Sequence, residues 1–135
     1  MRCHDYHLSG YDVSKFGTEL VLHLVDGLRP AAEESHIRFT EIELYHFVHV
    51  GGTIISDIEE VPLSQILDEY WERVLHWATQ YGGVPHWDRD DRAGYQRKLE
   101  ADGYRAWDIS SSIGFAGFVI AKNIEDVTDQ FTRTA

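Results

Sequence analysis

Cysteine is almost absent from this chain, and its absence narrows the settings in which the chain can work. The 135 residues contain one cysteine, Cys3, so no disulfide can form within the chain. A chain of this kind is most simply assigned to a reducing compartment. The first residues also lack the apolar stretch of a secretory signal peptide. We therefore expect a cytoplasmic protein.

Long apolar runs are absent as well. A helix needs about 20 apolar residues to cross a bilayer. The longest apolar run here, from Phe115 to Ala121, has only the length of a strand. The sequence therefore predicts no membrane partner.

Basic residues are scarce, with 12 Lys and Arg against 23 Asp and Glu and a net charge of −11. This charge repels nucleic acids and anionic membranes, and no local basic patch opposes it. The acidity serves solubility in one interpretation. In the other, it complements a partner with a basic surface. We expect no nucleic-acid partner.

Apolar and aromatic residues are present in the amounts that a folded domain needs, at 43 % and 13 %. The length is that of one ordinary domain, and no linker, repeat or low-complexity tract divides it. The sequence therefore predicts a single domain over residues 1–135, built around one core.

The first half of the chain has the alternating pattern of strands. We expect strands at 6–14, 18–25, 36–50 and 53–58, with a turn at Gly51-Gly52. The alternation changes phase near Thr40-Glu41, which indicates a bulge or bend at that point. His23 alternates with Leu22 and Leu24 of an apolar strand, so we expect it to be half-buried in the sheet rather than a ligand.

The second half opens with a clear helical pattern. Apolar residues recur at three- and four-residue spacing from Leu63 to Tyr81, after Pro62 in the first turn and before Gly82-Gly83. A second, shorter helix is expected between the caps at 88–91 and Gly103. Strands follow at 104–110 and 115–121, joined by a turn at 111–114, and the tail from Asn123 is expected to fray.

This order of elements predicts an α+β fold. We expect an antiparallel sheet of about five or six strands, with one long and one shorter helix packed on one face.

The N-terminus holds four possible metal donors in five residues. Cys3, His4, Asp5 and His7 are residue types that bind zinc, which needs three or four converging ligands. We take His4, Asp5 and His7 as the candidate metal site. The alternative is an ordered or frayed terminus with imidazoles that face solvent.

Other polar groups have ordinary structural explanations. His46 and His49 are three apart, so a regular strand places them on opposite faces. The cluster 86–91, which contains His86 and Asp88, can supply acid–base chemistry, but its carboxylates also suit a helix N-terminus. The run Ser110–Gly114 matches neither the phosphate-binding loop nor the nucleophile elbow.

Four aromatic residues lie on the long predicted helix, and they cannot all point straight at the sheet. Trp71 and Trp77 are the candidates for an exposed aromatic patch, which marks interfaces. A homodimer would be the simplest use of such a patch.

Three stretches of the chain together carry a resemblance. They are His4-Asp5, the run from His36 to Phe47 with its continuation at 54–58, and the run from Ser110 to Ala121. This arrangement resembles small bacterial proteins, some of which look like immunity proteins of toxin systems. The resemblance implies a cytoplasmic α+β domain that works by binding a protein, and it transfers no catalytic residue.

No motif in the sequence indicates catalysis or a cofactor, so we expect no cofactor and favour a non-enzymatic role while leaving an enzyme open. The favoured function is a non-enzymatic protein-binding module whose acidic surface binds a basic protein partner. The alternative is a small metal-binding protein or metal-dependent enzyme that uses the N-terminal group Cys3, His4, Asp5 and His7, or the pair His86 and Asp88.

Overall fold

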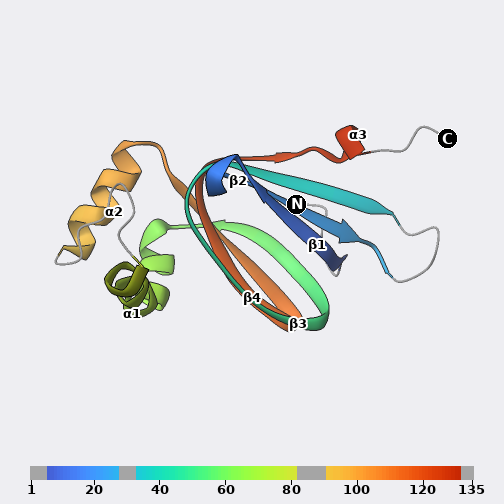
Figure 1. The fold of residues 1–135 in the computed structure, drawn as a ribbon, viewed down its shortest axis with the longest axis horizontal. Coiled ribbons are helices and arrows are strands. Elements are labelled where there is room, and N and C mark those ends of the chain that lie inside the picture. Colours follow the sequence, from blue (N-terminus) through green and yellow to red (C-terminus); the bar gives the residue numbers. More distant parts are fainter. Residues whose placement is uncertain (1–5, 28–32, 82–90, 132–135) are drawn as a thin grey trace.

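The computed structural model describes residues 6–27, 33–81 and 91–131. Within these ranges it describes the backbone alone, without side chains, at residues 49–54, 56, 78–81 and 112–115. Its elements, in chain order, are β1 (Tyr6–Ser14), the short helix η1 (Lys15–Gly17), β2 (Glu19–Val25), β3 (Glu34–Val61), α1 (Leu63–Tyr81), α2 (Arg92–Ala101), β4 (Arg105–Asp126) and α3 (Thr128–Phe131). Figure 1 shows a curved sheet with α1 and α2 together at one end and α3 at the other.

The strands β3 and β4 form one antiparallel ribbon that bends without a break. They pair from Ile37 opposite Asp126 to Val61 opposite Ala106, over 28 and 22 residues of chain. The predicted turns at Gly51-Gly52 and at 111–114 are therefore wrong. Between the pairs His49–Phe115 and Ile54–Ile113, the residues 50–53 face the single residue 114. The glycines and serines that suggested turns mark this irregularity instead. The irregularity lets the ribbon bend, and the chain forms no separate hairpin at either stretch.

The phase change predicted near Thr40-Glu41 is confirmed. Glu41 adopts a left-handed backbone conformation with φ of 52°. The register with β4 then shifts between Ile42 and Leu44, which leaves Glu43 as the extra residue. The inward-facing set of side chains changes phase at this point.

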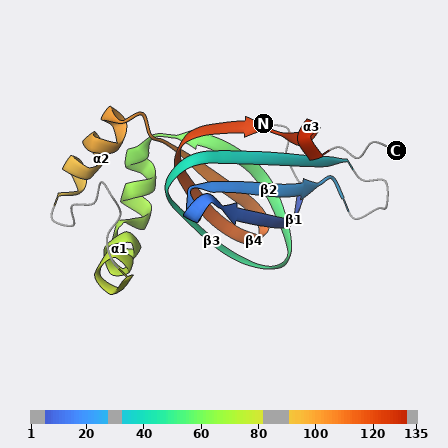
Figure 2. The same ribbon diagram turned by 45° about the horizontal axis from the view of Figure 1, so that its top comes forward.

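The bend brings the far half of β3 back to the first strand of the sheet. β1 pairs with β2 along its length, and its first residues, Tyr6 and His7, pair with Ile55 and Ile54 of β3. β2 pairs in turn with the first half of β3, from Glu34 to Thr40. The sheet therefore curls round (Figure 2), and six antiparallel segments result when β3 and β4 are each counted as two. The predicted α+β fold, with its antiparallel sheet of about five or six strands, is confirmed.

Two hydrophobic clusters replace the single core that we expected. The first lies inside the curved sheet and includes the alternating, fully buried leucines of β2, Leu20, Leu22 and Leu24. The second lies between the helices and the outer face of β4, where Phe118 and Ile120 meet α1 and α2. Alternation along β4 explains both clusters, because successive side chains of a strand point to opposite faces.

The helices begin and end close to the predicted positions. α1 starts directly after Pro62, and α2 has Asp91 as its N-cap, whose carboxylate accepts from the Gly94 backbone N–H at 2.7 Å. A Cβ on Gly94 would lie 2.1 Å from that carboxylate, so glycine is the residue that permits this cap. Gly103, with φ of 85°, follows the last turn.

The tail beyond Asn123 is ordered as far as Phe131, contrary to the prediction that it frays. β4 continues to Asp126, and Val127 is buried, with its N–H donating to the His36 carbonyl at 2.8 Å. α3 follows at Thr128. The tail is polar in sequence, but pairing with β3 satisfies its backbone.

Within the residues that the structure describes, every helix is too short or too polar to cross a bilayer.

The two clusters predict two separable contributions to stability. Leu22→Ala opens a cavity inside the sheet and Leu67→Ala opens one under the helices, and both residues are fully buried. Each is expected to lower the free energy of unfolding by about 2–5 kcal/mol. Because they lie in different clusters, the double variant should lose about the sum. Urea denaturation measures all three, and a large departure from additivity would show that the two clusters act as one.

Candidate binding site

The hairpin between β1 and β2 ends in a strained turn that presents an aromatic ring to solvent. Lys15 and Phe16 have φ of 51° and 58°, and Gly17 follows with φ of 87°. The left-handed region costs a non-glycine residue about 1–2 kcal/mol. The Phe16 side chain is nevertheless fully exposed, so burial of its ring does not offset the strain.

A pocket of about 540 Å³ lies beside this turn. It is lined by Phe16, Gly17, Thr18, Glu41, Ile42, Glu43 and Tyr104. The backbone N–H of Ile42 donates to the Thr18 carbonyl at 3.1 Å and so joins the turn to the bend in β3. Among the described residues, the non-glycine residues with positive φ are Lys15, Phe16 and Glu41. Two of these line the pocket and the third adjoins it, and strain of this kind clusters at functional sites.

The wall of the pocket on β3 is acidic. Glu43 is buried, and its Oε2 accepts a hydrogen bond from the Tyr95 hydroxyl at 3.1 Å. Burial, with the nearby Glu43 carboxylate as a second cause, raises the pKa of Tyr95 far above its usual value. Glu41 accepts from the Asn123 side-chain amide at 3.4 Å. Two carboxylates from one bend therefore face the same hollow.

Tyr104, directly before β4, also lines the pocket. Burial raises the pKa of its hydroxyl, and the charges of Glu43 and Glu41 add to the effect. The ammonium group of Lys122 lies 5.2 Å from the centre of its ring. The Thr18 hydroxyl donates to the Lys15 carbonyl at 2.7 Å, so it is not held as an activated nucleophile. The pocket thus offers aromatic surface and negative charge, which suit binding.

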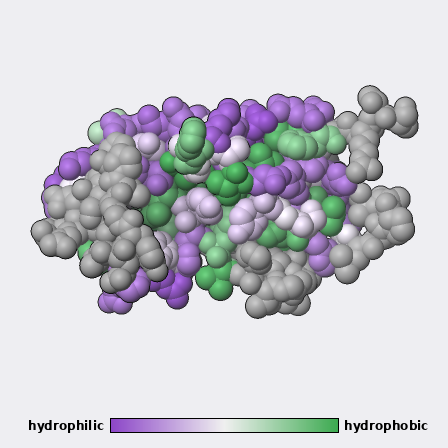
Figure 3. Space-filling model, viewed as in Figure 1, coloured by the Kyte–Doolittle hydropathy of each residue, from purple (hydrophilic) through white to green (hydrophobic). Residues whose placement is uncertain are grey.

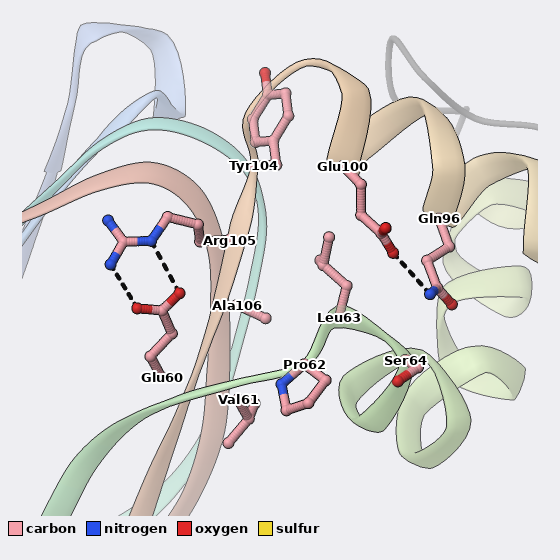
Figure 4. Close-up of a pocket in the computed structure, with 10 residues that line it drawn as sticks. All are labelled: Glu60, Val61, Pro62, Leu63, Ser64, Gln96, Glu100, Tyr104, Arg105 and Ala106. Carbon is pink, nitrogen blue, oxygen red and sulfur yellow. Dashed lines mark hydrogen bonds and ion pairs between the residues drawn. The ribbon is translucent and has the colours of Figure 1, made fainter.

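A second hollow, of about 310 Å³, lies where α1, α2 and β4 meet (Figure 4). Its charged side chains bind each other. Arg105 donates to Glu60, with Nε 2.9 Å from Oε2, and the Gln96 amide donates to Glu100 at 2.7 Å. Because these groups already satisfy one another, this hollow is a weaker candidate than the pocket beside Phe16.

Carboxylates also gather where α1 crosses the far half of the β3–β4 ribbon. Glu59 and Asp108 are directly opposite each other on β3 and β4. Burial raises the pKa of Asp108, and the charges of Glu69 and Glu59 raise it further. Like charges placed opposite each other destabilise a sheet, so this arrangement costs the fold some stability.

Two histidines meet on the outer face of β2 and β3. His23 and His36 are cross-strand partners, and their Nδ1 atoms lie 2.7 Å apart. The Nε2 atom of His23 lies 2.6 Å from Asp12, and that of His36 lies 3.3 Å from Glu34. The Phe131 ring stacks on His36 with a centroid distance of 4.4 Å. No sequence spacing predicted this group, because it depends on the register between two strands.

The predicted N-terminal metal site lies mostly outside the described residues. His4 and Asp5 precede them, as does Cys3, and His7 is the one member that is placed, in β1 opposite Val25 and Ile54. The described part of the chain contains no group of three or more metal-binding side chains. The N-terminal site therefore stays a prediction.

The other predicted groups are placed as follows. His46 packs against Trp77 at 4.6 Å, and burial followed by the charge of Arg73 lowers its pKa. The side chain of His49 and residues 86–90 lie outside the description, whereas Asp91 serves as the cap of α2. The stretch 110–114 is part of β4.

Trp71 and Trp77 are both partly buried and pack against the cluster beneath the helices. Trp71 lies 6.0 Å from the ring of Tyr95, and Trp77 lies beside His46. Their predicted role at an interface stays a prediction. The fully exposed aromatic ring of Phe16 was not predicted, since its exposure follows from the backbone of the turn.

The buried carboxylate of Glu43 makes Tyr95 a test of the pocket wall. Tyr95→Phe removes the hydroxyl that donates to Glu43. A hydrogen bond to a charged group contributes about 1.5–3 kcal/mol, so we expect a loss of that size in urea denaturation. Tyr45→Phe, at a partly buried position beside the sheet core, is the matched control and should cost less. Equal losses would show that Glu43 does not depend on Tyr95.

The crowded carboxylates predict a pH effect. The folded state raises the pKa of Asp108 above its ordinary value of 3.8. As pH rises through that value, the unfolded chain ionises first and the folded state loses stability until Asp108 also ionises. Asp108→Asn should therefore be more stable than the parent at pH 7 and equal to it at about pH 2–3. Thermal unfolding against pH measures this, with Glu72→Gln on the exposed face of α1 as a charge control. An equal gain at both pH values would contradict it.

Comparisons of the chain with protein-family models, with curated proteins and with solved structures found no match.

Proposed function

We propose that this chain is a non-enzymatic protein-binding module of the cytoplasm, and that it binds a basic protein at the pocket beside Phe16. The observation that carries the proposal is Phe16 itself, an aromatic side chain held fully exposed by two successive left-handed residues. The left-handed turn closes the β1–β2 hairpin, but it leaves the ring in solvent, where the apolar surface of Phe16 adds nothing to the stability of the isolated chain. Burial of the ring against a partner would offset the cost of the turn.

The chemistry around Phe16 favours a protein as the ligand. Exposed aromatic residues beside a hollow are typical of the few positions that dominate the binding energy of protein interfaces. Val13 is also exposed and lies on β1 of the same hairpin, so Phe16 does not stand alone. A partner that covers the hairpin end would bury both side chains.

The charge of the site favours a basic partner. Glu41 and Glu43 line the pocket, and the whole chain carries −11. Charge complementarity of this kind raises the rate of association and makes it sensitive to salt. The resemblance to immunity-like proteins fits the same interpretation, in which an acidic surface covers a basic toxin domain.

A homodimer is the second binding arrangement that the aromatic residues suggest. Such a dimer would use the surface of α1 that contains Trp71 and Trp77. This surface belongs to a different element from the hairpin that carries Phe16. Sedimentation of the purified chain separates the two arrangements. A dimer that Phe16→Gly leaves intact would place self-association elsewhere than the pocket.

The test is photo-crosslinking from the site. A photoreactive phenylalanine analogue at position 16 should crosslink to a discrete basic protein in cells. The same analogue at Val48, which is exposed in the middle of β3, is the control and should not capture that protein. Crosslinking should fall as salt is raised, because screening weakens charge steering. Absence of a discrete product at position 16, or equal capture at both positions, would contradict the proposal.

Phe16→Gly separates binding from folding. Glycine adopts the left-handed conformation freely, so the free energy of unfolding should stay level or rise by up to about 1 kcal/mol. Affinity for the captured partner should fall by about 30-fold or more, as expected for loss of a dominant aromatic side chain. Calorimetry of binding and urea denaturation of the variant measure the two effects. A variant that loses stability and keeps affinity would contradict the role of Phe16.

A further inference from the structure

The strand β1 has a neighbouring strand along one side and only the start of one along the other. It pairs with β2 from His7 to Ser14, but with β3 only at Tyr6 and His7. Beyond His7, the described residues place no strand on this second edge of β1. Such an edge presents backbone N–H and C=O groups in a row, which is a template for pairing with a further strand.

Solvent reaches the second edge of β1. Asp12, Val13 and Ser14 are exposed in succession, as expected of a strand that lacks a neighbour on one side. The Val13 side chain is 41 % exposed, although it lies opposite the fully buried Leu20. A Cβ on Gly10 would meet no atom within 4 Å outside its chain neighbours, so the space beside it is open. Figure 3 shows apolar side chains at the surface among hydrophilic ones in the region that β1 and β2 occupy in Figure 1.

The two faces of this edge differ in chemistry. Val13 lies on the inner face, because its cross-strand partner Leu20 belongs to the cluster inside the sheet. Asp12 points to the opposite, outer face, where its carboxylate lies 2.6 Å from the Nε2 atom of His23 and its side chain is 79 % exposed. A strand added here therefore meets apolar surface on one face and negative charge on the other.

We infer that the basic partner adds a strand to the second edge of β1, and that the added segment alternates basic with apolar residues. The inference rests on the proposed function for the identity of the partner, and it adds how the partner is held. In this mode of recognition main-chain hydrogen bonds supply affinity and alternate side chains supply specificity. Basic side chains of the segment pair with Asp12, and apolar ones cover Val13. Because β1 runs directly into the turn at Phe16, the same partner also reaches the pocket.

A second copy of the chain fits this edge less well. Two β1 strands related by a two-fold axis would meet in antiparallel order, and an axis near the middle of the exposed segment would bring the two Asp12 carboxylates together. Like charges on facing strands destabilise a sheet, and each copy carries −11 in total. Charge complementarity therefore favours a basic segment of another protein.

The experiment uses a capped hexapeptide that alternates lysine and valine, with hydrogen exchange of the whole chain measured by NMR. Saturating peptide should slow exchange by about 10-fold or more at those amides of residues 10–14 that face away from β2, because they become paired. Two further peptides are N-methylated, one at every lysine and one at every valine. Alternate N–H groups of a strand point to opposite edges, so one version should keep binding and the other should lose it. A peptide held by charge alone would bind equally in both versions.

Two variants test the chemistry of the edge. Asp12→Lys should weaken peptide binding by about 10-fold, whereas Glu72→Lys, the same charge change on an exposed position of α1, should leave it unchanged. Val13→Lys places on the edge the basic residue with which natural proteins block strand addition, so it should also weaken binding. Val48→Lys, at an exposed position of β3, is its control and should bind like the parent. Urea denaturation checks that each variant stays folded.

The outcomes separate this inference from the proposed function. A basic protein captured from position 16, without protection of residues 10–14 by that protein or by the peptide, would overturn strand addition and leave the proposed function standing. Protection by the peptide without any product from position 16 would do the reverse. Equal binding of the two N-methylated peptides would overturn strand addition. Protection that grows with the concentration of the chain alone would assign the edge to a second copy, and it would overturn the inference as well.

Discussion

The continuous ladder between β3 and β4 is the constraint on which the rest of the structure depends. These two strands supply four of the six segments of the sheet, and their shared bend returns the ribbon to β1. Inside the curve lies one hydrophobic cluster, and against its outer face the helices enclose the other. If the ribbon were straight, β1 would meet only β2, and the inner cluster would be open to solvent on one side.

The strand register also places the pocket beside Phe16 and the histidine pair. The phase change at Glu41 and the extra residue Glu43 turn two carboxylates towards the hairpin that presents Phe16. The straight pairing of β2 with the first half of β3 then sets His23 directly opposite His36. The pocket thus arises where the register is interrupted, and the histidine pair arises where it is regular.

Sequence reasoning succeeded where the signal is local. The alternation of the leucines in β2, the apolar stripe of α1 and the caps at Asp91 and Gly103 depend on neighbouring residues, and the structure confirms them. It failed at Gly51-Gly52, because glycines that loosen a strand and glycines that end it look alike in sequence. It also missed the His23–His36 pair and the exposed ring of Phe16. The histidine pair depends on the strand register and the exposed ring on backbone angles, and no single residue type predicts either.

The pairing of Ile37 with Asp126 has a consequence for how the protein is made. During synthesis the first half of β3 can pair with β2 soon after it emerges, but its other edge meets β4 only when the last strand has left the ribosome. Contacts between such distant parts of the chain form slowly, and strand edges stay exposed until they form. The acidic residues spread along the chain would keep such nascent chains apart by charge repulsion. Net negative charge would then protect the protein before it is folded.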